Sequence, residues 1–126
     1  MKIAISGSTG FIGRTLSQFF SSGGWTITPI VREDFNMGGA DLVKKVGGQD
    51  IIIHLAGAPL AARWTKKYKE QIVSSRVDTT RQMVDTIANM GKKPDLFISM
   101  SAVGIYRQDK IHIILLLIRM TFILNP

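Results

Sequence analysis

Three glycines at regular spacing, directly after a short apolar run, constrain this chain more than any other feature of its sequence. The run KIAI covers residues 2–5, and the segment GSTGFIG that follows contributes Gly7, Gly10 and Gly13. In a strand–turn–helix unit, the first glycine permits a sharp turn off the strand. The second lets the backbone approach an anion, and the third lets the helix pack closely on the sheet. The pattern therefore predicts a strand, a tight turn and a helix in that order.

Apolar runs alternate with amphipathic stretches up to about residue 100. We expect strands at residues 2–5, 25–31, 50–57 and 96–100, and helices at residues 11–22, 40–46 and 65–90. Strands and helices that alternate at this spacing form a parallel sheet with helices on both faces. The predicted fold class is therefore α/β, with a doubly wound parallel sheet.

The apolar residues of two helices recur at helical spacing and are expected to face the core. In the first helix they are Phe11, Ile12, Leu16, Phe19 and Phe20. In the long helix they are Ile72, Val73, Val77, Thr80, Met83, Val84, Ile87 and Ala88. Each helix is thus predicted to bury one face against the sheet.

Composition narrows the functions that the chain can carry. Its 126 residues are enough for one compact domain and too few for a two-lobed enzyme. The absence of cysteine excludes disulfide bonds and thiolate metal sites. His54 and His112 lie far apart in the sequence, so we expect no metal site. A chain without disulfides is compatible with the reducing cytoplasm, where we expect the protein to be found.

The formal net charge of +7 raises the question of a nucleic-acid partner. The densest basic stretch, RWTKKYK at residues 63–69, interleaves basic residues with Trp64 and Tyr68. Short basic runs of this kind are more often solvated helix faces than binding surfaces. We therefore expect no nucleic-acid partner, with an RNA-binding surface at residues 63–69 left open as an alternative.

The end of the chain, IHIILLLIRMTFILNP at residues 111–126, carries eleven apolar residues and no acidic residue. A helix that crosses a bilayer needs about 20 consecutive apolar residues, and Arg119 interrupts this run. The start of the chain, MKIAISGSTG, has too short an apolar run for a signal peptide. We therefore expect no association with a membrane.

The glycine turn lies where it can bind a phosphate group. Free N–H groups and the positive end of the helix dipole attract anions at the start of a helix. The hydroxyl groups of Ser8 and Thr9 add further donors. In a doubly wound sheet this position holds the pyrophosphate of a dinucleotide. The sequence therefore predicts a dinucleotide site at residues 7–13.

The residues after the second strand distinguish between two dinucleotides. An acidic residue there binds the ribose 2′-hydroxyl of NAD, whereas a basic residue binds the 2′-phosphate of NADP. Arg32 comes first after the strand and is followed by Glu33 and Asp34. This order favours NADP as the cofactor and leaves NAD open.

The exit of the third strand, DIIIHLAGAP at residues 50–59, supplies a second part of the site. Ligands of open α/β sheets lie across the carboxyl ends of the strands. The residues there are small or apolar, so a flat adenine or ribose can lie against the backbone of Leu55, Ala56, Gly57 and Ala58. His54 is interpreted as a buried strand residue and not as a base.

Five segments of the chain, taken in order, resemble one family: SGSTGFIG, DIIIHLAGAP, RWT, SRVDTTRQMVDTI and SAVGIY. From residue 1 to about residue 106 the chain is similar to the atypical extended short-chain dehydrogenases/reductases. Within them it resembles the epimerase-like branch, which includes NAD-dependent epimerase/dehydratases and nucleoside-diphosphate-sugar epimerases. The resemblance implies an N-terminal Rossmann fold that binds NAD(P), followed by a smaller substrate-binding lobe.

The resemblance also implies a role for each matching residue. It places five residues along the pyrophosphate: Gly7, Gly10, Phe11, Ile12 and Gly13. It places Arg32 at the ribose phosphate, and Leu55, Ala56 and Gly57 beside the adenosine. It implies that Ser101, at the end of its strand, polarises a carbonyl or hydroxyl group of an unidentified small-molecule substrate.

The segment SAVGIYRQDK contains a Tyr-x-x-x-Lys pattern at Tyr106 and Lys110. In the family the catalytic pair lies on a helix about two dozen residues beyond the serine, where the Tyr transfers the proton. Tyr106 instead matches the tyrosine of a turn in the family, with Arg107 where glycine is usual. We therefore interpret this pattern as a coincidence.

After Lys110 the likeness to the family ends. We predict an NAD(P)-binding Rossmann domain at residues 1–110 and an apolar tail outside the family at residues 111–126, and hence a truncated Rossmann-like fold. The predicted function is an NAD(P)-dependent oxidoreductase or epimerase of the short-chain type, in a truncated copy that keeps the cofactor-binding half. The alternative is a non-catalytic NADP-binding or redox-sensing protein. The sequence predicts neither the substrate nor the oligomeric state.

Overall fold

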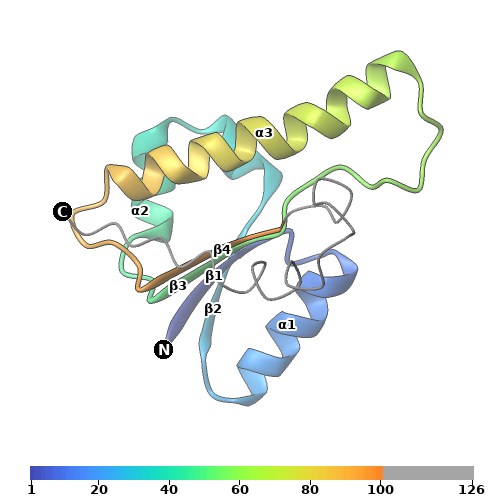
Figure 1. The fold of residues 1–126 in the computed structure, drawn as a ribbon. Coiled ribbons are helices and arrows are strands. Elements are labelled where there is room, and N and C mark those ends of the chain that lie inside the picture. Colours follow the sequence, from blue (N-terminus) through green and yellow to red (C-terminus); the bar gives the residue numbers. More distant parts are fainter. Residues whose placement is uncertain (101–126) are drawn as a thin grey trace, which may run out of the picture.

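Four parallel strands form one sheet with helices on both faces in the computed structural model, which describes residues 1–100 (Figure 1). The strands are β1 (Lys2–Ser6), β2 (Thr26–Ile30), β3 (Ile51–His54) and β4 (Leu96–Ser99). The helices are α1 (Phe11–Ser22), α2 (Gly39–Val46) and α3 (Lys66–Ala88), with a 3-10 helix η1 (Arg32–Asn36) after β2. α1 covers one face of the sheet, and α2 and α3 cover the other. The prediction of a doubly wound parallel α/β fold is confirmed.

The order of the strands across the sheet is β2-β1-β3-β4. The chain therefore moves outward from β1 to β2 and then crosses back to β3 on the other side of β1. In the aligned register, Ser6 at the end of β1 lies between Ile30 of β2 and His54 of β3. Open α/β sheets bind their ligands at such a reversal, outside the carboxyl ends of the strands.

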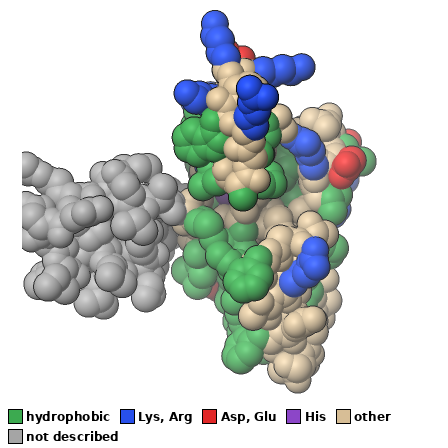
Figure 2. All heavy atoms as spheres, turned by 90° about the vertical axis from the view of Figure 1, so that its right-hand side faces the viewer, with side chains coloured by type: hydrophobic (Ala, Val, Ile, Leu, Met, Phe, Trp, Pro, Cys, Tyr) green, Lys and Arg blue, Asp and Glu red, His purple; other side chains and the backbone are tan. Residues whose placement is uncertain are grey.

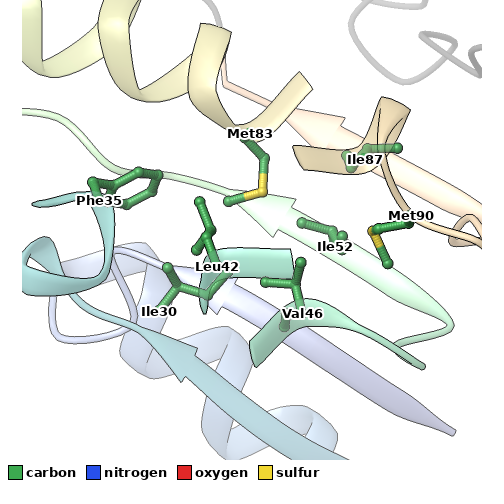
Figure 3. Close-up of a cluster of buried hydrophobic side chains, with 9 residues drawn as sticks. Ile30, Phe35, Leu42, Val46, Ile52, Met83, Ile87 and Met90 are labelled. Atoms are coloured by element: carbon green, nitrogen blue, oxygen red, sulfur yellow. The ribbon is translucent and has the colours of Figure 1, made fainter. Parts of the chain in front are cut away.

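The larger of two hydrophobic cores lies between the sheet and the layer that α2, α3 and η1 form. Figure 3 shows its main side chains: Ile30, Phe35, Leu42, Val46, Ile52, Met83, Ile87 and Met90. On the opposite face, α1 packs Leu16 and Phe20 against Ile3, Ile5 and Ile53. Because successive side chains of a strand point to opposite faces, β1 supplies Ala4 to the first core and its isoleucines to the second.

The predicted buried faces of the two helices are only partly correct. In α1, Phe11 is 91% exposed, and Ile12 and Phe19 are also exposed. In α3, Met83 and Ile87 are buried, whereas four predicted core residues are exposed: Val73, Val77, Val84 and Ala88. The N-terminal half of α3 extends beyond the sheet (Figure 1), so its apolar residues have no strand beneath them. Helical spacing identifies a face, but the sheet decides how much of that face is covered.

Two element boundaries matter for the site. β3 ends at His54, so residues 55–57 form a loop and not the strand end that the apolar run suggested. α3 begins after Thr65, whose hydroxyl oxygen accepts a hydrogen bond from the Tyr68 amide at 3.1 Å. None of the helices in residues 1–100 combines the length and apolar character that a bilayer-crossing segment requires.

Candidate functional site

The turn between β1 and α1 requires glycine at two positions for reasons internal to the fold. Gly7 has φ +70°, in the left-handed region, and a Cβ there would lie 2.8 Å from the Leu55 carbonyl oxygen. A Cβ on Gly13 would lie 2.2 Å from the Gly7 oxygen and 2.7 Å from the Ser8 Cα atom. α1 therefore packs directly on the turn, as the glycine spacing predicted.

Gly10 differs from these two glycines. It is the N-cap of α1 with φ −74° and ψ 172°, a conformation that any residue adopts. A Cβ there would have one neighbour within 4 Å, the Gly7 oxygen at 3.2 Å. A side chain at this position would thus need a shift of only a few tenths of an ångström, in contrast to Gly7 and Gly13.

The start of α1 is suited to an anion. Gly10 offers no side-chain cap, and the first turn of the helix contains no acidic residue. The Arg14 guanidinium, in that turn, donates to the Thr9 carbonyl oxygen at 2.6 Å and adds positive charge. The first amide groups of a helix lack partners within the helix, and the helix dipole makes this end positive. A phosphate group is a fitting ligand for such an end.

A cleft of about 450 Å³ opens beside this turn, at the carboxyl ends of β1, β2 and β3. Seven predicted site residues line it: Gly7, Ser8, Thr9, Arg32, Ala56, Gly57 and Ala58. The other five in the described part of the chain do not line its walls: Gly10, Phe11, Ile12, Gly13 and Leu55. The side chains of Phe11 and Ile12 point to solvent, so only their main-chain amides are available to a ligand in the cleft.

The charged residues after β2 occupy different positions. Arg32 and Glu33 are exposed and line the cleft. Asp34 is 5% exposed, and its carboxylate accepts hydrogen bonds from the Val31 amide at 2.7 Å and the Lys45 ammonium at 2.5 Å. Asp34 is therefore committed to holding η1 against α2, which leaves Arg32 and Glu33 to face a ligand.

The opposite wall of the cleft, residues 55–58, is tied to α3 by two residues that sequence reasoning had not selected. The Ser75 hydroxyl accepts from the Ala58 amide at 2.8 Å, and the Arg76 guanidinium donates to the Ala58 carbonyl oxygen at 3.1 Å. A Cβ on Gly57 would lie 3.0 Å from the Arg76 Cζ atom. Glycine at 57 thus makes room for the Arg76 side chain. Both residues belong to the segment SRVDTTRQMVDTI, which carries the resemblance but suggested no contact.

His54 is buried, as predicted, but both nitrogens of its ring have hydrogen-bond partners. Nδ1 lies 2.8 Å from the Ser6 hydroxyl, and Nε2 lies 3.3 Å from the Thr79 hydroxyl. The rings of Phe35 and Phe97 flank it, and no acidic or basic side chain within residues 1–100 bonds to it. Burial away from water lowers the pKa of His54 to about 4 from its ordinary value of 6.5.

We expect this histidine to make folding sensitive to acid. Between pH 6.5 and pH 4 the unfolded chain binds a proton at His54, whereas the folded chain does not, so stability falls as the pH falls. The full loss is about 3 kcal/mol. Urea unfolding across this range measures it, with His54→Gln as the reference. Equal pH slopes for the wild type and the variant would contradict the prediction.

Three predicted features lie outside the described residues: Ser101, the Tyr106/Lys110 pattern, and the tail at 111–126. Within residues 1–100, no group of three or more histidine, acidic or cysteine residues could hold a metal ion.

The basic residues Arg63, Lys66, Lys67 and Lys69 are exposed. Figure 2 shows basic side chains gathered at the top of the molecule, where α3 begins.

A doubly wound parallel sheet, a glycine turn at a helix start and a cleft at the strand reversal define a Rossmann-like domain with a nucleotide-type site. Comparison with known proteins gives the family. The family model described as "NAD dependent epimerase/dehydratase family" matches residues 3–114, and the chain belongs to this family. The resemblance seen in the sequence is thus confirmed.

Two curated relatives carry the name epimerase family protein. YfhF of Bacillus subtilis is 36% identical over 118 residues, which cover 84% of this chain and 39% of the relative. SSP1921 of Staphylococcus saprophyticus is 34% identical over 115 residues, which cover 83% of this chain and 39% of the relative. The chain therefore spans about two fifths of the length of these relatives.

Two solved structures share the fold. The human epimerase family protein SDR39U1, isoform 2, solved with NADPH, superimposes with a TM-score of 0.71 at 22% identity, over 85% of this chain and 38% of that protein. UDP-glucuronic acid 4-epimerase of Bacillus cereus, solved with UDP-glucuronic acid and NAD, gives 0.70 at 24% identity, over 87% and 43%. At these identities the superpositions support the Rossmann-like fold and no finer property.

Proposed function

We propose that the cleft binds a nicotinamide dinucleotide, with NADP preferred over NAD. The observation that carries this proposal is one cleft lined by the glycine turn at the start of α1 and by Arg32 at the end of β2. The first feature suits a pyrophosphate and the second a ribose 2′-phosphate. Family membership supports a nicotinamide dinucleotide, and the two superimposed structures were solved with NADPH and with NAD, so the preference for NADP rests on Arg32 alone.

Each wall of the cleft would hold one part of the cofactor. The main-chain amides at residues 11–13, at the free start of α1, would bind the pyrophosphate together with the hydroxyl groups of Ser8 and Thr9, because the Gly10 amide already donates to the Gly7 oxygen. Residues 55–58 would lie against the adenosine, because Ala56, Gly57 and Ala58 carry little side chain. Arg32 would donate to the 2′-phosphate, while Glu33 at the same wall keeps binding of NAD possible.

The chain would thus be the cofactor-binding part of an NAD(P)-dependent oxidoreductase or epimerase of the short-chain type. A bound nicotinamide supplies hydride transfer, and Ser101 would polarise the reacting carbonyl or hydroxyl group. We assign the cofactor-binding domain to residues 1–110 and leave residues 111–126 outside it. A sugar nucleotide is the substrate class that the Bacillus cereus relative suggests. The non-catalytic alternative uses the same cleft and predicts binding of NADP without turnover of any carbonyl substrate.

The choice of cofactor depends on Arg32. A hydrogen bond to a charged group is worth roughly 1.5–3 kcal/mol, so Arg32→Ala is expected to weaken NADPH binding by roughly 10- to 100-fold. The affinity for NADH is expected to stay within about twofold, because NADH has no 2′-phosphate. Isothermal titration calorimetry with both cofactors measures the two affinities.

Arg63→Ala is the matched control, because Arg63 is also an exposed arginine but does not line the cleft. This variant should bind both cofactors like the wild type. If Arg32→Ala lost equal affinity for NADPH and for NADH, the assignment of the 2′-phosphate to this residue would be refuted. No binding of either cofactor to the wild-type chain would refute the proposed function itself.

A further inference from the structure

A chain of hydrogen bonds crosses the sheet beneath the cleft and ends on both sides at its wall. The Ser6 hydroxyl oxygen, at the end of β1, lies 3.0 Å from the Leu55 amide and 3.2 Å from the Ala56 amide. His54 links this hydroxyl to the Thr79 hydroxyl on α3. Thr79 itself lines the cleft. The sheet, the loop at 55–58 and α3 therefore meet at one buried imidazole.

The distances determine where the protons lie. The Ser6 oxygen accepts from two amides, so its single proton is donated to His54 Nδ1. Thr79 donates its proton to the Ser75 carbonyl oxygen at 2.7 Å, so its oxygen accepts from His54 Nε2. Burial lowers the pKa of His54 to about 4, which keeps the ring neutral at neutral pH. The imidazole is thus the Nε2–H tautomer, and each polar atom of the chain has a partner.

The amide of Ala56 depends on this chain of hydrogen bonds more than the amide of Leu55 does. The Leu55 amide also donates to the Ser6 carbonyl oxygen at 3.2 Å, which continues the sheet by one bond. For the Ala56 amide, Ser6 Oγ is the partner within residues 1–100. Because the Ser6 hydroxyl donates to His54 Nδ1, the lone pairs of its oxygen point toward the two amides. Their direction therefore determines the path of the polypeptide as it leaves β3. That path forms the wall at Ala56 and Gly57.

We propose that His54 is a positioning residue for the dinucleotide: through Ser6 it holds residues 55–58 in the conformation that binds the adenosine side of the cofactor. This inference rests on the proposed function of the cleft. It assigns His54 no contact with the cofactor and no proton transfer. Its role is to orient a hydroxyl group whose oxygen orients two amides. The identity of the side chain at 54 then matters for affinity and not only for packing.

Two measurements on the ligand-free protein test the chain of hydrogen bonds directly. A long-range proton–nitrogen spectrum should show the His54 ring as the Nε2–H tautomer at neutral pH. Amide exchange should show protection at Ala56 that is lost in Ser6→Ala, while Leu55 keeps part of its protection through the Ser6 carbonyl oxygen. The opposite tautomer, or an Ala56 amide that exchanges equally fast in the wild type and in Ser6→Ala, would overturn the inference.

Two substitutions at His54 separate positioning from packing. The amide of His54→Asn reaches the position of Nδ1 and can accept from Ser6, whereas the amide of His54→Gln reaches the position of Nε2 and can bond only to Thr79. Neither side chain titrates, and both are polar and smaller than the ring. We expect NADPH affinity within about threefold of wild type for His54→Asn and a loss of about tenfold or more for His54→Gln.

Four outcomes of the calorimetric titration are distinguishable. Selective loss in His54→Gln, at similar melting temperatures of the two variants, supports the positioning role. Equal affinity of both variants and the wild type overturns it, while the proposed function stands. Equal losses in both variants also overturn it, because packing alone then accounts for the effect. A wild-type chain that does not bind NADPH refutes the proposed function, and the tautomer and exchange measurements still decide the hydrogen-bond chain.

Discussion

Gly10→Leu is expected to abolish most of the dinucleotide affinity of this chain while leaving its fold intact. The fold can accept a side chain at this N-cap after a small shift, because the backbone conformation is open to any residue and a Cβ makes one tight contact, with the Gly7 oxygen at 3.2 Å. A bound pyrophosphate would lie against the same position, so the leucine would occupy its space. We expect NADPH binding to weaken by about 100-fold or more, which corresponds to about 3 kcal/mol. Calorimetric titration with NADPH measures this loss.

Thermal unfolding supplies the second measurement for Gly10→Leu. Loss of glycine at an N-cap costs up to about 1 kcal/mol, so the melting temperature should fall by less than about 8 °C. Gly38→Leu is the control, since Gly38 is also the N-cap of a helix, also has extended backbone, and has open space where a Cβ would stand. Gly38 belongs neither to the cleft nor to the turn that begins α1, so Gly38→Leu should bind NADPH normally. Unchanged affinity in Gly10→Leu would refute the pyrophosphate site.

Gly13→Ala is expected to have the opposite profile, a large loss of stability. Alanine normally stabilises a helix by about 1 kcal/mol relative to glycine. At Gly13 the added Cβ would overlap main-chain atoms, with the Gly7 oxygen at 2.2 Å and the Ser8 Cα atom at 2.7 Å. Rotation of a side chain cannot relieve this overlap, so α1 must move away from the turn and from its contacts with Ile3 and Ile5. We expect a net loss of about 3 kcal/mol, at the upper end for an overpacked core.

Urea unfolding measures this loss, and a domain of this size should lose roughly 15 °C in melting temperature. Gly39→Ala is the control, because Gly39 is also in a helix and a Cβ there has nothing within 4 Å. That substitution should leave stability unchanged or raise it slightly. A Gly13→Ala variant as stable as the wild type would show that the turn and α1 are not in contact in solution.

Much of this fold could be predicted because its signals are local. Glycine spacing, apolar runs and helix stops placed the four strands and the three α-helices of residues 1–100 within a few positions of their observed ranges, and missed only η1. Gly23, for example, ends α1, as was predicted from the glycine pair that follows the amphipathic stretch. The extent of burial was predicted less well, since Val73 and Val77 satisfy helical spacing yet lie where α3 extends beyond the sheet.

The residues of the candidate site also divide into those that the sequence could select and those that only the fold brings together. The residues of the glycine turn and Arg32 could be selected from the chain alone, because their spacing from a strand end is a local property. The role of Asp34 could not, since only the fold brings Lys45 to its carboxylate. Ser75, Arg76 and Thr79 carried no signal either, because each bonds to a residue that lies well before it in the sequence, Ala58 for the first two and His54 for Thr79.

The sequence by itself determined the strand–turn–helix unit, the alternation that makes the sheet parallel, and the family to which the chain belongs. Those properties depend on neighbouring residues and on the backbone freedom of glycine. The tertiary structure alone decided that a Cβ at Gly10 would make one tight contact while a Cβ at Gly13 would overlap the turn. It also decided that His54 joins Ser6 to Thr79 across the sheet. Distances between atoms far apart in the chain exist only once the strands have paired, and no local pattern encodes them.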